Sequence, residues 1–222
     1  MIDLHTHSLL SDGEFLPSEL ARRAKMKGYR VIGISDHVDE TNIEEVIPSL
    51  LKLLKGRASE MGIEIVVGAE ITHVPKGLIR ELTGVARKLG ASYVVVHGET
   101  ITEPVEEGTN RAAIEAGCDI LAHPGLIERE DVVLARERGV FLEISGRRGH
   151  AFTNGHVARL AKEIGAPLIF NTDAHGSGDL LALPDAKKIV VGAGLLEEDF
   201  SLLQKNAFSL VERIRRDGHH LR

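Results

Sequence analysis

The chain has 222 residues, which is within the size of one large α/β domain. Its single cysteine, Cys118, excludes a disulfide framework and a cysteine-based zinc finger. The net charge of −6, the 4% aromatic content and the lack of tryptophan disfavour a nucleic-acid-binding protein. We see neither an apolar run of membrane-spanning length nor the pattern of a signal peptide, so we expect a cytoplasmic protein without a membrane partner.

Seven short apolar runs have the pattern of strands. Their nearly continuous apolar and β-branched character is typical of parallel strands that are buried on both faces. The predicted strands are Ile2–His5, Val31–Ser35, Glu64–Glu70, Tyr93–His97, Ile120–His123, Phe141–Ser145 and Leu168–Thr172.

Helical patterns lie between the strands, and a glycine follows each of the first six, as expected at a left-handed C-cap. The predicted helices are Pro17–Lys27, Ile43–Met61, Leu78–Leu89, Arg111–Ala116, Glu128–Arg138 and His156–Ile164, and then Pro184–Val191, Glu197–Leu203 and Ala207–Arg216. This alternation predicts an α/β fold in which seven parallel strands close into a barrel related to the TIM barrel. We expect residues 1–222 to form a single domain, with a flexible polar tail at 217–222.

Side chains of metal-binding type stand at or just after the carboxyl ends of the predicted strands. They are His5, His7, Asp12, His37, Glu70, His97, His123, Asp173 and His175. In a parallel barrel these ends form one face, where the active site lies. A lone histidine at a strand end is more often structural, but chance agreement across so many strands is improbable. The sequence therefore predicts that these side chains converge on a metal centre.

The same residues stand in motifs that resemble those of the polymerase and histidinol phosphatase (PHP) family of metal-dependent phosphoesterases. The resemblance covers nearly the whole chain. Its motifs are His5-Thr6-His7 with Ser11-Asp12-Gly13, Ser35-Asp36-His37, Gly68-Ala69-Glu70, Val96-His97-Gly98, Ala122-His123-Pro124 and Thr172-Asp173-Ala174-His175. The resemblance implies a distorted seven-stranded (β/α)7 barrel that holds up to three metal ions.

Carried over residue by residue, the resemblance implies three metal sites. The first would be held by His5, His7, Glu70 and Asp173. The second would be held by Glu70, His97 and His123, with Glu70 bridging the two ions. The third would be held by Asp12, His37 and His175. Imidazole and carboxylate ligands suit zinc, manganese or iron, and the sequence leaves the choice among these open.

Two or three divalent ions about 3.5–4 Å apart can clamp a phosphate ester and lower the pKa of a bridging water. We therefore expect a hydrolase of a small phosphomonoester, similar to the histidinol-phosphatase-like subgroup, with Glu70 and Asp173 among the catalytic groups. A nuclease or nucleotide phosphatase is an alternative, which the acidic charge balance disfavours. A non-catalytic, metal-bound regulatory barrel is another, which the complete ligand set disfavours.

The sixth predicted strand leads into a loop with further candidates. A guanidinium fork matches phosphate oxygens, so Arg147 or Arg148 is a candidate phosphate clamp, against the alternative of a solvated charge pair. His150 is either a general acid for the leaving alkoxide or loop surface. Glu143, inside the strand, is either an acid that supports a ligand or the buried partner of an arginine. Asp36 either orients an imidazole or caps a turn.

Two stretches after ligand-bearing strands, Glu70–Pro75 and His97–Pro104, are expected at the rim of the barrel, where they could form a substrate pocket. The segment Gly108–Arg111 either joins that pocket or begins a helix, with Thr109 or Asn110 as the cap.

Overall fold

Strands and helices alternate along the chain much as the sequence pattern predicts. The computed structural model describes residues 1–55 and 58–216, so the tail predicted at 217–222 lies outside the described residues. The strands are β1 (Ile2–Asp3), β2 (Val31–Ile34), β3 (His37–Val38), β4 (Glu64–Ile71), β5 (Tyr93–His97), β6 (Ile120–Ala122), β7 (Phe141–Ser145) and β8 (Leu168–Asn171). The α-helices are α1 (Pro17–Met26), α2 (Ile43–Lys55), α3 (Ile79–Leu89), α4 (Thr109–Ala116), α5 (Arg129–Arg138), α6 (Asn154–Ile164), α7 (Leu183–Gly192) and α8 (Asp199–Arg216). Short 3₁₀ helices are η1 (Ala58–Met61), η2 (Lys76–Leu78) and η3 (His150–Thr153).

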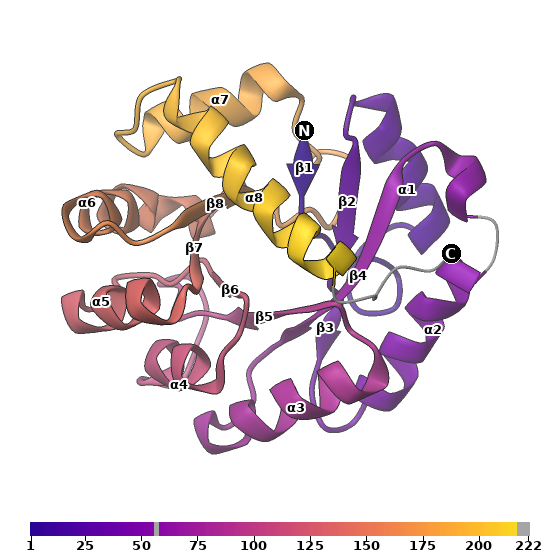
Figure 1. Ribbon diagram of the computed structural model, residues 1–222, viewed down its shortest axis with the longest axis horizontal. Coiled ribbons are helices and arrows are strands. Elements are labelled where there is room, and N and C mark those ends of the chain that lie inside the picture. Colours follow the sequence, from indigo (N-terminus) through magenta and orange to yellow (C-terminus); the bar gives the residue numbers. More distant parts are fainter. Residues whose placement is uncertain (56–57, 217–222) are drawn as a thin grey trace.

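The strands form a nearly closed barrel of seven parallel strands, which confirms the predicted fold class. They are hydrogen-bonded in the order β1-β2-β4-β5-β6-β7-β8. Helices surround the strands on the outside, so the strands are buried on both faces, as their apolar character requires (Figure 1). No helix among those described is long and apolar enough to cross a membrane.

The ring closes between the first and last strands by a bridge and a side-chain hydrogen bond. Thr6 and Ala174, which follow β1 and β8, form an isolated parallel bridge. The backbone N–H of Leu4 donates to Oδ1 of Asn171 at 2.9 Å. These contacts join segments that are 167 residues apart in sequence, and they place the loops after β1 and β8 side by side.

A short strand, β3, follows the second predicted strand and was not predicted. Beyond Ile34 the chain leaves the ladder at Ser35 and Asp36 and then pairs again with β4 as β3. The side chain of Asp36 accepts hydrogen bonds from the loop after β1, which accounts for the interruption. In the resumed register His37 lies directly beside Glu70.

Two predicted helix boundaries are wrong. Within the helix expected over 43–61, the described residues form an α-helix over Ile43–Lys55 and a 3₁₀ helix over Ala58–Met61. The two helices expected over 197–203 and 207–216 are a single helix, α8. Polar side chains between the two expected helices bind strand backbone: Gln204 bonds both backbone groups of Ile2, and Asn206 donates to the carbonyl of Leu168.

Helix α8 covers the end of the barrel at which the strands begin (Figure 1). Its apolar residues, including Leu210 and Ile214, form one cluster with interior side chains of the strands. Two of its arginines pair with acids at this end, Arg213 with Asp119 and Arg215 with Glu64. The basic cluster at the end of the chain therefore helps to hold α8 in place.

Tyr93 fills the barrel interior because two glycines leave room for its ring. Its side chain is fully buried. A methyl group at Gly68 would lie 2.4 Å from Cζ of Tyr93, and one at Gly33 would lie 2.2 Å from Oη. Both distances are far below van der Waals contact, so neither position has space for a larger side chain.

We predict that Gly68→Ala lowers the free energy of unfolding by about 1–3 kcal/mol, because the added methyl overpacks the interior against Tyr93. The matched control is Gly84→Ala in α3, where the methyl would meet no atom within 4 Å. There the change should raise stability by about 0.5–1 kcal/mol, since glycine disfavours a helix interior. Urea unfolding followed by circular dichroism, with a chelator present, measures both. A Gly68→Ala protein as stable as the control contradicts the packing argument.

Candidate metal centre

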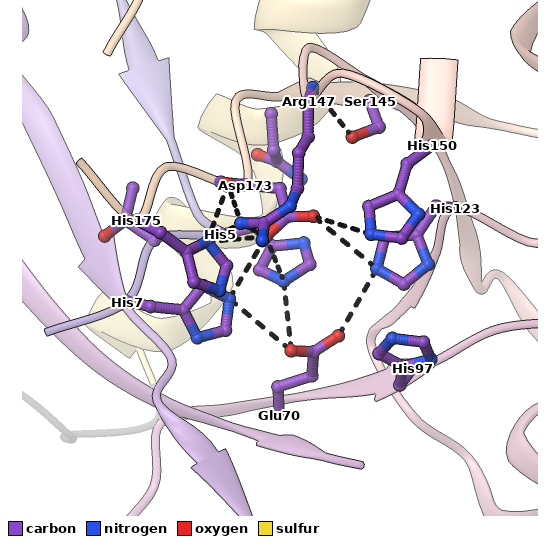
Figure 2. A network of polar contacts seen from close by, with 12 residues as sticks. His5, His7, Glu70, His97, His123, Ser145, Arg147, His150, Asp173 and His175 are labelled. Carbon is purple, nitrogen blue, oxygen red and sulfur yellow. Dashed lines mark hydrogen bonds and ion pairs between the residues drawn. The ribbon is translucent and has the colours of Figure 1, made fainter. Parts of the chain in front are cut away.

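All nine side chains predicted as metal ligands lie together at the carboxyl ends of the strands. They come from β3, β4 and β5 and from the loops that follow β1, β6 and β8. Figure 2 shows the imidazoles of His5, His7, His97, His123 and His175 around the carboxylates of Glu70 and Asp173. The site lies at the end of the barrel opposite α8.

Glu70 is the centre of the cluster and is fully buried. Its Oε2 lies 2.8 Å from Nδ1 of His37, 3.2 Å from Nε2 of His5 and 3.5 Å from Nε2 of His7. Its Oε1 faces the other way, 3.6 Å from Nε2 of His123. The two oxygens thus face different groups of imidazoles, as a carboxylate that bridges two ions must.

Asp173 lies across from Glu70. Its Oδ1 is 3.2 Å from Nε2 of His7 and 3.6 Å from Nε2 of His5. Its Oδ2 is 3.7 Å from Nε2 of His123. A second carboxylate therefore spans the same imidazoles from the opposite side (Figure 2).

Backbone strain is concentrated at this site. In the described part of the chain, the non-glycine residues with positive φ are His73, His123 and Asp173, at 52°, 26° and 53°. Each stands just after a strand end, where the left-handed turn directs its side chain toward the barrel mouth. Such conformations cost free energy and tend to cluster where function requires them.

An outer group surrounds the half-exposed Asp12. Its Oδ1 lies 3.1 Å from Nε2 of His175 and 3.5 Å from Nε2 of His37. The ring of His7 stacks on both imidazoles, with centroid distances of 4.1 and 4.2 Å. This is the set that the family resemblance implies for a third ion, with His7 lying next to it.

The group implied for the second ion is looser. His97 and His123 have ring centroids 4.4 Å apart. The carboxylate at ion-pair distance from His97 is that of Glu103, 3.0 Å from Nε2, and not that of Glu70. His97 Nδ1 lies 3.1 Å from the carbonyl oxygen of Gly98, so Nε2, the nitrogen beside Glu103, is the one that would bind a cation.

His150 lies inside the site and not on the loop surface. Its ring is buried and stacks on His123 with centroids 4.1 Å apart. Nδ1 lies 2.7 Å from Oγ1 of Thr100. Nε2 lies 3.4 Å from Glu103 and 3.8 Å from Asp173, so this nitrogen faces the centre of the mouth.

These residues fit divalent cations. His7 forms no hydrogen bond through either ring nitrogen, although the ring is completely buried. Burial, aided by His37, lowers its pKa well below the usual value. Burial would raise the pKa of Glu70, but His5 and His37 hold it well below its usual value. For His7 and Glu70 these shifts favour neutral imidazole and ionised carboxylate, the forms that bind metal ions, and a buried ring nitrogen without a hydrogen bond calls for a partner.

Acids behind the cluster hold it in shape. Oε2 of the buried Glu143 lies 2.8 Å from Nδ1 of His5 and accepts a hydrogen bond from Asn171 at 2.9 Å. This supports the first of the two predicted roles of Glu143, and it is the usual way of fixing a metal-binding imidazole. Asp36 contacts no imidazole this way; it accepts from Ser8 and Ser11, with oxygen–oxygen distances of 2.6 Å, and so fixes the loop that carries Asp12.

The two arginines after β7 differ. The guanidinium of Arg147 lies at the mouth beside His175, with Nη1 3.8 Å from Oδ1 of Asp173 (Figure 2). Arg148 is exposed and lies outside the lining of the cavity. The structure thus places Arg147, and not Arg148, at the cavity, whereas the sequence left the choice between them open.

A cavity of about 410 Å³ opens over the cluster, and Glu103, Thr72 and His73 line it with the predicted residues. Glu103 contacts three imidazoles, yet the sequence did not single it out among several acids in its loop. Its position in the stretch His97–Pro104, already expected at the rim, was the only available signal.

The chain is similar in sequence to an uncharacterised protein and to a probable phosphatase. It is 45% identical over 200 residues to an uncharacterised protein of Methanocaldococcus jannaschii, covering 89% of this chain and 91% of that one. It is 30% identical over 219 residues to a probable phosphatase of Thermoanaerobacter sp. strain X514, covering 89% and 88%.

Among solved structures, a chain of the cryo-EM structure of archaeal ribonuclease P with mature tRNA superposes with a TM-score of 0.72. The match covers 95% of this chain and 90% of that one at 16% identity, which bears on the fold alone. The sequence model of the PHP domain matches residues 3–165, which include seven of the nine converging side chains. The chain belongs to the PHP domain family.

Proposed function

We propose that this protein is a metal-dependent phosphoesterase that hydrolyses a small phosphomonoester. The observation that carries the proposal is the convergence of buried, unpaired imidazole nitrogens on two carboxylates, Glu70 and Asp173. Kinship with probable phosphatases supports the same reaction class. The cluster lies at the end of the barrel where enzymes of this architecture carry their active sites.

We expect the ions to be bound by the nine converging side chains, with Glu70 shared between two of them. Zinc, manganese and iron all suit these ligands. When bound, two or three such ions supply charge neutralisation for the phosphate and a water that ionises near neutral pH. Glu143 would keep the ring of His5 oriented, and Asp36 would keep the Asp12 loop in place.

Arg147 and His150 are the proposed substrate-handling residues. Arg147 presents a cation at the mouth beside Asp173, where it would hold phosphate oxygens. His150 presents Nε2 to the same space from the other side. Burial, together with the neighbouring His123, lowers the pKa of this ring to about 3, so we propose that the neutral imidazole donates an N–H hydrogen bond to the leaving oxygen. Its contact with Thr100 fixes the ring for that role.

The cavity favours a small substrate, because its 410 Å³ is typical of a site for a compact molecule. Arg213 and Arg215 lie at the opposite end of the barrel, engaged with Asp119 and Glu64, so they offer no basic track beside the site.

A nuclease or nucleotide phosphatase is the alternative function, and a histidinol-phosphate-like ester is one candidate substrate within the favoured class of small phosphomonoesters. A regulatory barrel without catalysis is the third reading. We keep the expectation of a cytoplasmic location.

The proposal is tested by a phosphate-release screen of the full chain. It should cover phosphomonoesters, nucleotides and short oligonucleotides, each with zinc, manganese or iron. We expect turnover of at least one small phosphomonoester and little of the oligonucleotides. Preference for oligonucleotides would favour the nuclease, and no turnover of any substrate by metal-loaded protein would favour the regulatory barrel.

Glu70→Gln should weaken two ions at once, since its oxygens face two groups of imidazoles. We expect the wild-type protein to contain at least about two ions per chain, and the variant to lose metal and more than about 100-fold in kcat. Elemental analysis and steady-state kinetics measure the two effects. His73→Ala, at the rim, is the comparison and should lose less. Equal losses would contradict the separation of ligand from rim.

Arg147→Ala should raise KM with a smaller effect on kcat, because a cation that holds the phosphate throughout the reaction contributes uniform binding. The expected size is about 1–3 kcal/mol, as for other hydrogen bonds to charged groups. Arg148→Ala is the matched control and should behave as wild type. Kinetics on the best substrate of the screen, with metal content verified, decide the question. If KM and kcat are unchanged in Arg147→Ala, Arg147 does not bind the phosphate.

A further inference from the structure

A second cavity, of about 240 Å³, lies beside the candidate metal centre. Its walls come from the ends of β4 and β5, the start of α3, and the segment that leads into α4. In Figure 1 these elements are neighbours on one side of the barrel. We call this space the side cavity. Its apolar lining comprises Ile71, Val74, Pro75, Ile79, Val96, Pro104 and Val105.

The lining is fixed and largely apolar. Ile71, Ile79 and Val96 are each 1% exposed and belong to the main hydrophobic core. Two polar groups of the lining are already engaged: Glu106 accepts the backbone N–H of Lys76 at 3.0 Å, and Thr109 donates to the backbone carbonyl of Glu106 at 2.6 Å. A charged or strongly hydrated ligand would therefore find little compensation there.

The side cavity is a recess that opens to solvent beside the exposed Pro75, Pro104 and Glu106, while its floor is formed by buried core side chains. Sites for small molecules are typically concave, mostly apolar and formed in advance. The side cavity has these properties and adjoins a cluster of polar, metal-binding side chains.

His73 and His97 line both cavities, so the side cavity adjoins the candidate metal centre and these two side chains stand between them. The ring centroids of these residues are 4.7 Å apart, and Nε2 of His73 lies 3.2 Å from Glu103. The left-handed backbone conformation of His73 holds its ring at the boundary between the two cavities. A ligand that reaches from the metal centre past His73 would place its anionic end among the imidazoles and its apolar end in the side cavity.

We propose that the side cavity binds an uncharged, apolar group on the alcohol portion of the substrate. This inference rests on the proposed function, because it takes the phosphate of the same ester to lie at the metal centre. The substrate class is then a phosphomonoester of an alcohol that carries a compact aromatic or branched aliphatic group. Val105 is a residue that sets the size of this group.

The test uses methyl, butyl and 2-phenylethyl phosphate, because these alkyl esters share one leaving-group chemistry and differ in apolar size. For the wild-type, metal-loaded protein we expect kcat/KM to rise at least about tenfold from methyl to 2-phenylethyl phosphate. Val105→Phe should fill the side cavity and remove most of that gain, while leaving methyl phosphate hydrolysis close to wild type. Inhibition by the matching alkylphosphonates should follow the same order, which gives a readout independent of turnover.

Val191→Phe, on an exposed face of α7, is the matched control and should change nothing. Val105→Ala, which enlarges the cavity, should keep the preference for the larger esters and guards against misfolding of the phenylalanine variant. A flat series in wild type with methyl phosphate turned over would overturn this inference and leave the proposed function intact. Equal losses on all esters in Val105→Phe, with metal content unchanged, would also overturn it. No turnover of any phosphoester would instead count against the proposed function.

Discussion

A buried carboxylate among imidazoles is the constraint on which the site depends. Glu70 has no exposed surface, and an unpaired charge there would be very costly. Its register beside His37 and its contacts with His5 and His123 supply the compensating partners from separate strands. Because those partners come from β3 and from the loops after β1 and β6, the charge is stabilised only when these strands are assembled with β4. The fold and the cluster therefore form together.

One end of the barrel contributes packing that stabilises the fold, and the other end carries the candidate metal centre. At the end covered by α8, interior side chains pack around Tyr93, whose ring occupies the space that Gly33 and Gly68 leave free. At the other end, polar residues replace apolar ones, and strained residues such as His123 and Asp173 aim into the mouth. Strained backbone can persist there because the packed end holds the strands that flank it. This arrangement lets the loops at the mouth vary without loss of the core.

The sequence predicts the barrel and the convergence of ligands well, because both follow from strand periodicity and from the rule that parallel strands end on one face. It could not separate Arg147 from Arg148, since the direction in which a glycine-flanked loop turns is a tertiary property. Nor could it identify Glu103, one acid among several in a loop whose path is set by contacts with other loops. The division of α8 failed for a related reason: Gln204 is polar because it binds a strand end, not because the helix stops.

Charged side chains differ between the two sides of the mouth of the site. Arg147 stands on the side of Asp173 and His175, whereas Glu103 stands on the side of His73. Under the proposed function, the bound ions and Arg147 would hold the phosphate on the first side, where Asp173 also lies. The uncharged part of the ester would then extend toward Glu103, past His73. That is where the apolar walls of the side cavity begin, so the same orientation would also suit the packing of the proposed ester.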